Sequence, residues 1–160
     1  ACRITGRQIA LVSKSVSKDK ISKFVDYCSP DIQIMTVEFD SQTGQLDIND
    51  LRNKISGDTA CIYFENPSYL GIIEKQGNEI SNITHELDSL VLVGVDPISL
   101  GVLTPPVNYG ADIVSGDLQP LGMHPNFGGG QAGFIASRDD VRFVMEFPTR
   151  LFGIDRKSVV

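Results

Sequence analysis

The stretch VDPISLGVLTPPVNYGADIVSGDLQPLGMHPNFGGGQAGF, residues 95–134, decides the fold of this chain. An apolar run leads into it, two loops rich in glycine and proline interrupt it, and a short apolar run leaves it. It contains Asp96 at the end of an expected strand, the doublet Pro105-Pro106 and the triplet Gly128-Gly129-Gly130. Loops of this length inside a compact domain usually carry a function. The stretch contains no lysine.

Strand-like and helix-like patterns alternate along the chain. Apolar or β-branched runs predict strands, at residues 8–12, 32–39, 60–64, 90–95, 113–115 and 133–136. Apolar residues at helical spacing predict helices, at residues 17–29, 47–55, 80–87 and 141–145. Such alternation is typical of a parallel sheet with right-handed crossovers. The expected fold class is α/β, built in layers around a mostly parallel sheet.

The composition describes one globular domain of 160 residues that is 41% hydrophobic and 21% charged. The net charge of −6 leaves no excess of Lys and Arg for phosphate contacts, so nucleic acid is not an expected partner. No apolar run is long enough to cross a membrane, so no membrane partner is expected either. The three scattered cysteines, Cys2, Cys28 and Cys61, fit a reduced, cytoplasmic protein better than a disulfide scaffold.

Proline-containing turns follow three of the expected strands. They are Asn66-Pro67, Asp96-Pro97 and Gln119-Pro120. In open parallel sheets, ligands bind at the carboxyl ends of the strands. We therefore expect these three turns to meet at one edge of the sheet. Their spacing alone names no chemistry.

The common catalytic and binding motifs are absent from the sequence. It has no GxGxxG opening a helix after the first strand, no GK[ST] loop and no GxSxG elbow. The two histidines, His85 and His124, are far apart, and no pair of cysteines has metal-ligand spacing, so no metal site is expected. His85 is expected to be an ordinary histidine on a helix surface. Cys28 and Cys61 are expected to be small buried hydrophobes.

Several long segments resemble one known family. They are DLQPLG (117–122) with the glycine cluster after it, FPTRLFG (147–153), TGRQIALVSKSV (5–16) and ENPSYLGIIE (65–74). Together they are similar to the P-protein of the glycine cleavage system in its split form, and there to glycine dehydrogenase (decarboxylating) subunit 1, the alpha subunit. The similarity runs over residues 5–153.

The resemblance implies a fold and an activity. The fold would be the central part of the large domain of the aspartate-aminotransferase-like, pyridoxal-phosphate (PLP fold type I) enzymes, with three layers. Residues 1–160 would then be a single α/β domain, a fragment of a longer subunit without its N-terminal helices and C-terminal small domain. The activity would be glycine decarboxylation, an oxidoreductase reaction with aminomethyl transfer to the lipoyl arm of H-protein. Two alpha and two beta subunits would form the enzyme, in the cytoplasm.

The position of the lysine decides which subunit is catalytic. Catalytic family members bind pyridoxal phosphate covalently through a lysine that follows the strand matching residues 111–115. Here that loop reads SGDLQPLG, and Gln119 or Pro120 stands nearest the expected lysine. The seven lysines are Lys14, Lys18, Lys20, Lys23, Lys54, Lys75 and Lys157. The resemblance therefore implies a non-catalytic partner with no catalytic residue and no covalently bound cofactor, while the beta subunit holds pyridoxal phosphate.

The resemblance also assigns vestigial cofactor-binding positions. Asp96 aligns with the aspartate that pairs with the pyridine nitrogen, and Asn66 with an asparagine-proline turn. The residues Gly128, Gly129 and Gly130 can approach a phosphate through backbone amides. Each has a plainer interpretation as a turn former, and both interpretations stay open.

Three further residues are candidates for the interface with the beta subunit: Gln119, His124 and Arg150. An alternative function also stays open. The domain would then be a non-covalent pyridoxal-phosphate-binding module or a purely structural interaction module.

Overall fold

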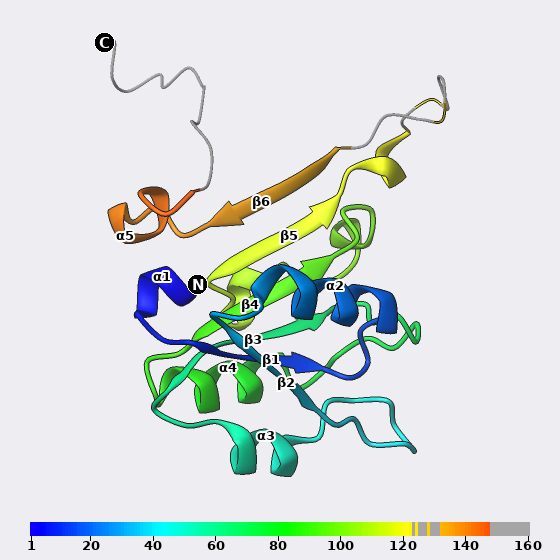
Figure 1. The fold of residues 1–160 in the computed structure, drawn as a ribbon. Coiled ribbons are helices and arrows are strands. Elements are labelled where there is room, and N and C mark those ends of the chain that lie inside the picture. Colours follow the sequence, from blue (N-terminus) through cyan, green and yellow to red (C-terminus); the bar gives the residue numbers. More distant parts are fainter. Residues whose placement is uncertain (123, 125–127, 129–131, 148–160) are drawn as a thin grey trace, which may run out of the picture.

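The structure is a computed structural model that describes residues 1–122, 124, 128 and 132–147. Its centre is a six-stranded sheet with the order β2-β1-β3-β4-β5-β6 (Figure 1). The strands are β1 (Ile9–Ser13), β2 (Gln33–Val37), β3 (Thr59–Glu65), β4 (Leu90–Val95), β5 (Ile113–Asp117) and β6 (Gly133–Ser137). The α-helices are α1 (Cys2–Thr5), α2 (Lys18–Cys28), α3 (Ile48–Lys54), α4 (Gly77–His85) and α5 (Val141–Val144). The described residues also form the 3₁₀ turns η1 (Ser99–Gly101), η2 (Pro106–Tyr109) and η3 (Gln119–Leu121).

The mostly parallel sheet predicted from the sequence is confirmed. Strands β1 to β5 pair in parallel, and β6 pairs antiparallel to β5. Each expected strand exists within a residue or two of its predicted bounds. Helix α4 differs more: it begins at Gly77 and ends at His85, before the predicted end at residue 87.

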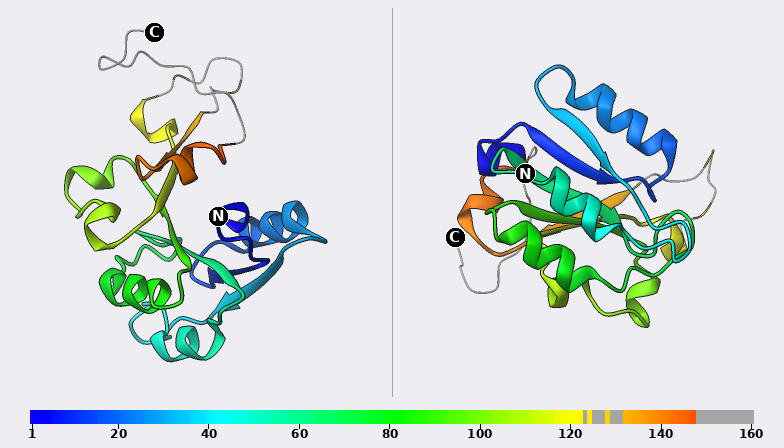
Figure 2. Two further views of the ribbon diagram at one scale, coloured as in Figure 1. Left: turned by 90° about the vertical axis from the view of Figure 1, so that its left-hand side faces the viewer. Right: turned by 90° about the horizontal axis from the view of Figure 1, so that it is seen from below.

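Helices cover the two faces of the sheet unequally (Figure 2). Helices α3 and α4 lie against one face, where the large core contains buried side chains from sheet and helices. Its fully buried members include Leu11, Ile62, Phe64, Leu51 and Ile80. Helices α1 and α2 lie against the other face, where the buried cluster consists only of Ala10, Ala60 and Cys61 among the described residues. The small side chains on this face leave room for a cavity.

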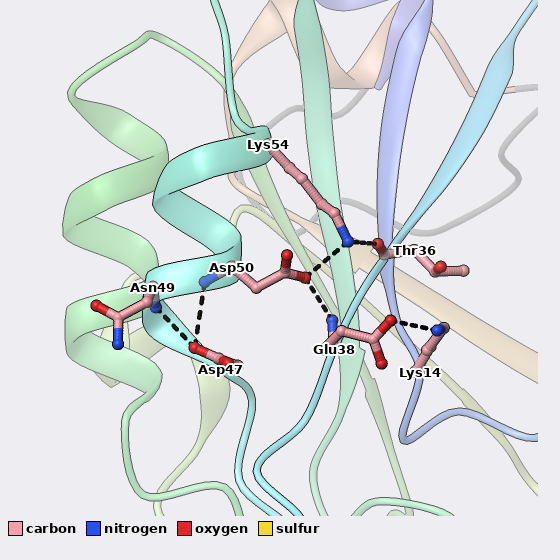
Figure 3. A network of polar contacts seen from close by, with 7 residues as sticks. All are labelled: Lys14, Thr36, Glu38, Asp47, Asn49, Asp50 and Lys54. Atoms are coloured by element: carbon pink, nitrogen blue, oxygen red, sulfur yellow. Dashed lines mark hydrogen bonds and ion pairs between the residues drawn. The ribbon is translucent and has the colours of Figure 1, made fainter.

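A polar network attaches α3 to β2 (Figure 3). The Asp50 carboxylate accepts a hydrogen bond from the Glu38 backbone N–H at 2.7 Å. Lys54, one turn later, donates to the Asp50 carboxylate and to the Thr36 carbonyl, both at 2.8 Å. Asp47 caps the helix by accepting from the backbone N–H of Asn49 and Asp50. This seven-residue helix fully buries Leu51 and packs Ile48 against the core, and the polar network adds to this attachment.

A second network lies at the amino ends of the central strands. Asp112 is buried, and its carboxylate accepts from the Val91 backbone N–H at 2.8 Å. It also contacts His85 Nε2 at 2.8 Å and Arg138 Nε at 2.9 Å. His85 is therefore more than the ordinary surface histidine expected from the sequence, because it joins α4 to the start of β5.

The helices of the described residues are short. None of them combines the length and the apolar content that crossing a lipid bilayer requires.

Candidate functional site

A cavity of about 1390 Å³ lies on the face of the sheet that α1 and α2 partly cover. Because side chains alternate between the two faces of a strand, every second residue of a strand points into it. On β3 these residues are Cys61, Tyr63 and Glu65. On β5 they include Ile113 and Ser115.

The turns after the strands meet at one end of this cavity, as their spacing predicts. Pro67 after β3, Asp96 and Pro97 after β4, and Gln119 and Pro120 after β5 all line it. The carboxyl ends of three neighbouring strands thus form its polar rim.

Three residues of the cavity wall, Tyr63, Glu65 and Lys20, form a hydrogen-bonded group. The Tyr63 hydroxyl donates to Glu65 Oε1 at 3.1 Å, and Lys20 on α2 forms an ion pair with the same oxygen. Phe24, also on α2, meets the Tyr63 ring edge-on, with 5.1 Å between ring centroids. Burial and the neighbouring Glu65 charge raise the pKa of the Tyr63 hydroxyl well above its usual value. Tyr63 therefore stays a protonated hydrogen-bond donor at physiological pH.

Sequence reasoning missed this group. The spacing of Tyr63 and Glu65 by two residues on a strand places both on one face, and that signal was available. The pairing of Lys20 with Glu65 could not be predicted from a local pattern, because the two residues are 45 positions apart in the sequence.

Asp96 lies at the rim of the cavity and is exposed. One carboxylate oxygen accepts from the Ile98 backbone N–H at 3.0 Å. Its backbone carbonyl accepts from the Ser99 hydroxyl at 2.7 Å, at the start of η1. Asp96 therefore forms a turn and also presents its carboxylate to the cavity.

Asn66 has a different position. Its side chain is buried and is not among those that line the cavity. Its amide donates to the Glu74 carbonyl at 3.2 Å, and its oxygen accepts from the Glu74 backbone N–H at 3.1 Å. Both bonds close the loop of residues 66–74 after β3.

Three more of the sequence-predicted residues, Gln119, His124 and Gly128, lie between β5 and β6. Gln119 is exposed at the cavity rim, and its backbone N–H donates to Asp117 Oδ1 at 2.8 Å. His124 and Gly128 are exposed, and Gly128 has a left-handed φ of +101°. Gly129, Gly130 and Arg150 lie outside the described residues.

The charges around the cavity are mainly negative. Four acidic side chains line it, those of Glu65, Asp96, Asp117 and Glu146, against two basic side chains, Lys20 and Arg3. Both cations are already paired: Lys20 with Glu65, and Arg3 with Glu146 at 2.6 Å. A phosphate would therefore meet two further carboxylates and no unpaired basic side chain among the described lining residues.

These observations test whether the described residues fit pyridoxal phosphate. Asp96 can face a pyridine nitrogen, but the described lining offers neither an unpaired cationic side chain for the phosphate nor a lysine after β5. The described residues alone therefore do not fit this cofactor. They also contain no group of three or more His, Cys, Asp or Glu side chains arranged to hold a metal ion.

Comparison with known proteins places the chain in a family. The family model of the glycine cleavage system P-protein matches residues 3–159. The probable glycine dehydrogenase (decarboxylating) subunit 1 of Staphylothermus marinus is 44% identical over 131 residues, which are 81% of this chain and 28% of that protein. The chain spans about a third or less of the length of the curated relatives that it matches.

Solved structures agree with this result. The crystal structure of a glycine decarboxylase (P-protein) of the glycine cleavage system, in inhibitor-bound form, superposes with a TM-score of 0.82. It is 32% identical, over 94% of this chain and 32% of that chain. A cystathione gamma lyase from Micromonospora echinospora has a TM-score of 0.65 at 18% identity, over 86% of this chain and 34% of its own, which shows the fold alone. The fold is that of PLP fold type I enzymes, as predicted, and the chain belongs to the glycine cleavage system P-protein family.

Proposed function

We propose that the chain acts within subunit 1 of a split P-protein that decarboxylates glycine and transfers the aminomethyl group to the lipoyl arm of H-protein. The 44% identity to a protein named glycine dehydrogenase (decarboxylating) subunit 1 supports this function. The subunit name implies a second subunit, and we propose an assembly of two alpha and two beta subunits in the cytoplasm.

Within this assembly, we assign the chain the role of the non-catalytic partner. The observation that carries this assignment is the loop after β5, where Gln119 and Pro120 stand and no lysine does. Of the described lysines, Lys20 is the one that lines the cavity, and its ammonium group is held by Glu65. A lysine must lose its proton before it can attack a carbonyl group, and the Glu65 carboxylate favours the protonated form.

The cofactor chemistry then belongs to the second subunit. Pyridoxal phosphate supplies an electron sink for the carbanion that decarboxylation produces. The carboxylates at the cavity rim of this chain would repel both the phosphate and the glycine carboxylate. This chain's contribution is a packed α/β scaffold that completes the assembly.

The cofactor attachment can be tested directly in the assembled enzyme. The complex of both full-length subunits is incubated with pyridoxal phosphate, reduced with borohydride and separated, and the mass of each subunit is measured. We expect the second subunit to gain the mass of one reduced cofactor and subunit 1 to keep its mass. A cofactor adduct on Lys20 or another lysine of subunit 1 would contradict the non-catalytic role.

The position of Asp96 favours a second candidate function. Its carboxylate lines the cavity where a pyridine nitrogen would be recognised, so non-covalent binding of pyridoxal phosphate by this chain is the alternative. The chain is titrated with pyridoxal phosphate, and binding is monitored by the absorbance and fluorescence of the cofactor. This titration distinguishes a cofactor-binding role from a purely structural role. A saturable change that Asp96→Asn abolishes supports the alternative. No change supports a purely structural interaction role.

A further inference from the structure

The three cysteines of the chain are far apart in the sequence but converge on one wall of the cavity. Cys2 in α1, Cys28 at the end of α2 and Cys61 in β3 all line it, and all three are free thiols. Cys61 is only 4% exposed. Cys2 is half-buried and packs against the small cluster that contains Cys61.

Cys2 is held in this position by the contacts of α1. The turn is closed by a hydrogen bond from the Thr5 N–H to the Ala1 carbonyl and ends at Gly6, which has a left-handed φ of 69°. Arg3, the next residue, forms an ion pair with Glu146 at 2.6 Å and donates to the Glu146 carbonyl at 2.7 Å. These contacts tie α1 to the segment after α5. The approach of Cys2 to β3 is therefore fixed by both neighbours in the sequence.

We propose that Cys2 and Cys61 form an oxidation site, in which Cys2 reacts first with a hydroperoxide and Cys61 then closes an intramolecular disulfide. The site requires a nucleophilic thiol with access to the cavity and a second thiol beside it. Cys2 meets the first requirement and Cys61 the second.

The contact between the two thiols also prepares Cys2 for reaction. A hydrogen bond with the Cys61 thiol lowers the pKa of Cys2 to about 6, and the same contact together with burial raises the pKa of Cys61. Burial likewise raises the pKa of Cys28. A lowered pKa favours the thiolate, which is the form that attacks a peroxide.

The two steps balance as follows. The Cys2 thiolate attacks one oxygen of hydrogen peroxide, the O–O bond breaks, and hydroxide leaves and takes up a proton to become water. Cys2 is thereby oxidised to the sulfenic acid and the peroxide is reduced. The Cys61 thiol, losing its proton, then attacks the Cys2 sulfur, and the sulfenic hydroxyl leaves with that proton as a second water. The product is the Cys2–Cys61 disulfide.

The first experiment measures which cysteine reacts, without any oxidant. The chain is alkylated with iodoacetamide from pH 5 to pH 9, and the rate at each cysteine is followed by mass spectrometry. Between pH 7 and pH 6 we expect the rate at Cys2 to fall about twofold, and the rate at Cys28 to fall about tenfold. Equal pH profiles for Cys2 and Cys28 would overturn the proposal. In Cys61→Val, the Cys2 profile should shift to higher pH.

The second experiment maps the product. The chain is treated with one equivalent of hydrogen peroxide and digested without reduction. We expect the peptide with Cys2 linked to the peptide with Cys61, in the wild type and equally in the control Cys28→Ser. In Cys2→Ser the disulfide should be absent, and in Cys61→Val the sulfenic acid at Cys2 should be trapped by dimedone. A disulfide that contains Cys28, or no intramolecular disulfide at all, would overturn the proposal.

Discussion

The Tyr63 hydroxyl lies directly over the backbone of Gly94: a Cβ built at Gly94 would be 2.3 Å from the hydroxyl oxygen. Glu65 Cγ would be 3.0 Å from the same Cβ. Strand β4 therefore has no side chain at this position because the Tyr63–Glu65 pair of β3 occupies the space. This close approach links the packing of the sheet to the polar group in the cavity wall.

Replacing Gly94 by alanine tests this relationship. Gly94→Ala should displace the Tyr63 hydroxyl from Glu65 and lower the free energy of unfolding by about 1–3 kcal/mol, because the added methyl overpacks a filled site. Urea unfolding measures this change. The control is Gly57→Ala, where a new Cβ meets no atom within 4 Å. Equal losses of stability in the two variants would show that Tyr63 does not fill this space.

The buried Asp112 is expected to contribute strongly to stability. Asp112→Ala removes the partner of His85 and Arg138 and leaves the Val91 N–H without its acceptor. We expect a loss of about 1–3 kcal/mol, because the buried Val91 N–H is left without an acceptor. The control is the exposed neighbour Asp139→Ala, which should change stability by less than about 0.5 kcal/mol. A loss below about 1 kcal/mol in Asp112→Ala would contradict this network's role.

The Asp50 network predicts a dependence on pH. Burial opposes the ionisation of Asp50, but the Glu38 N–H and Lys54 outweigh it, so the folded-state pKa lies below 3.8. A depressed pKa in the folded state stabilises it above the unfolded pKa of about 3.9, and this stabilisation is lost as pH falls through the folded pKa. Asp50→Asn should therefore be about 1–2 kcal/mol less stable than the wild type at pH 7, and this difference should shrink as pH falls through the folded-state pKa of Asp50.

Chemical unfolding of both proteins between pH 2 and pH 7 provides the measurement. The exposed Asp58→Asn is the matched control and should follow the wild type at every pH. A stability difference between Asp50→Asn and the wild type that stays constant down to pH 2 would show that ionisation of Asp50 is not its source.

The sequence predicts the strands of this fold better than their directions and contacts. The run at residues 90–95 is apolar on both faces and matches β4, because a central parallel strand is covered on both sides. The direction of β6 has no such signal, since residue alternation is the same in parallel and antiparallel strands. The helix of residues 77–85 stops earlier than its apolar spacing suggests, because a tight turn with a positive φ at Asp88 follows.

Some residues of the candidate site could be predicted from the sequence, and others could not. Asp96 and Gln119 could be placed at the cavity rim because each follows a predicted strand, and strand ends meet in a parallel sheet. The sequence did not predict the Lys20–Glu65 pair or the convergence of Cys2, Cys28 and Cys61. These contacts depend on how α1 and α2 lie on the sheet. No local pattern in the sequence encodes that arrangement.

The proposed division of labour between subunits has one most direct test. Glycine-dependent exchange of labelled carbon dioxide is measured with full-length subunit 1 alone, the second subunit alone, and both together, each with pyridoxal phosphate and lipoylated H-protein. We expect exchange in the mixture and none from subunit 1 alone, with Gln119→Ala in subunit 1 leaving the chemistry in place. Exchange catalysed by subunit 1 alone would mean that it holds its own reactive lysine, and would contradict the non-catalytic role.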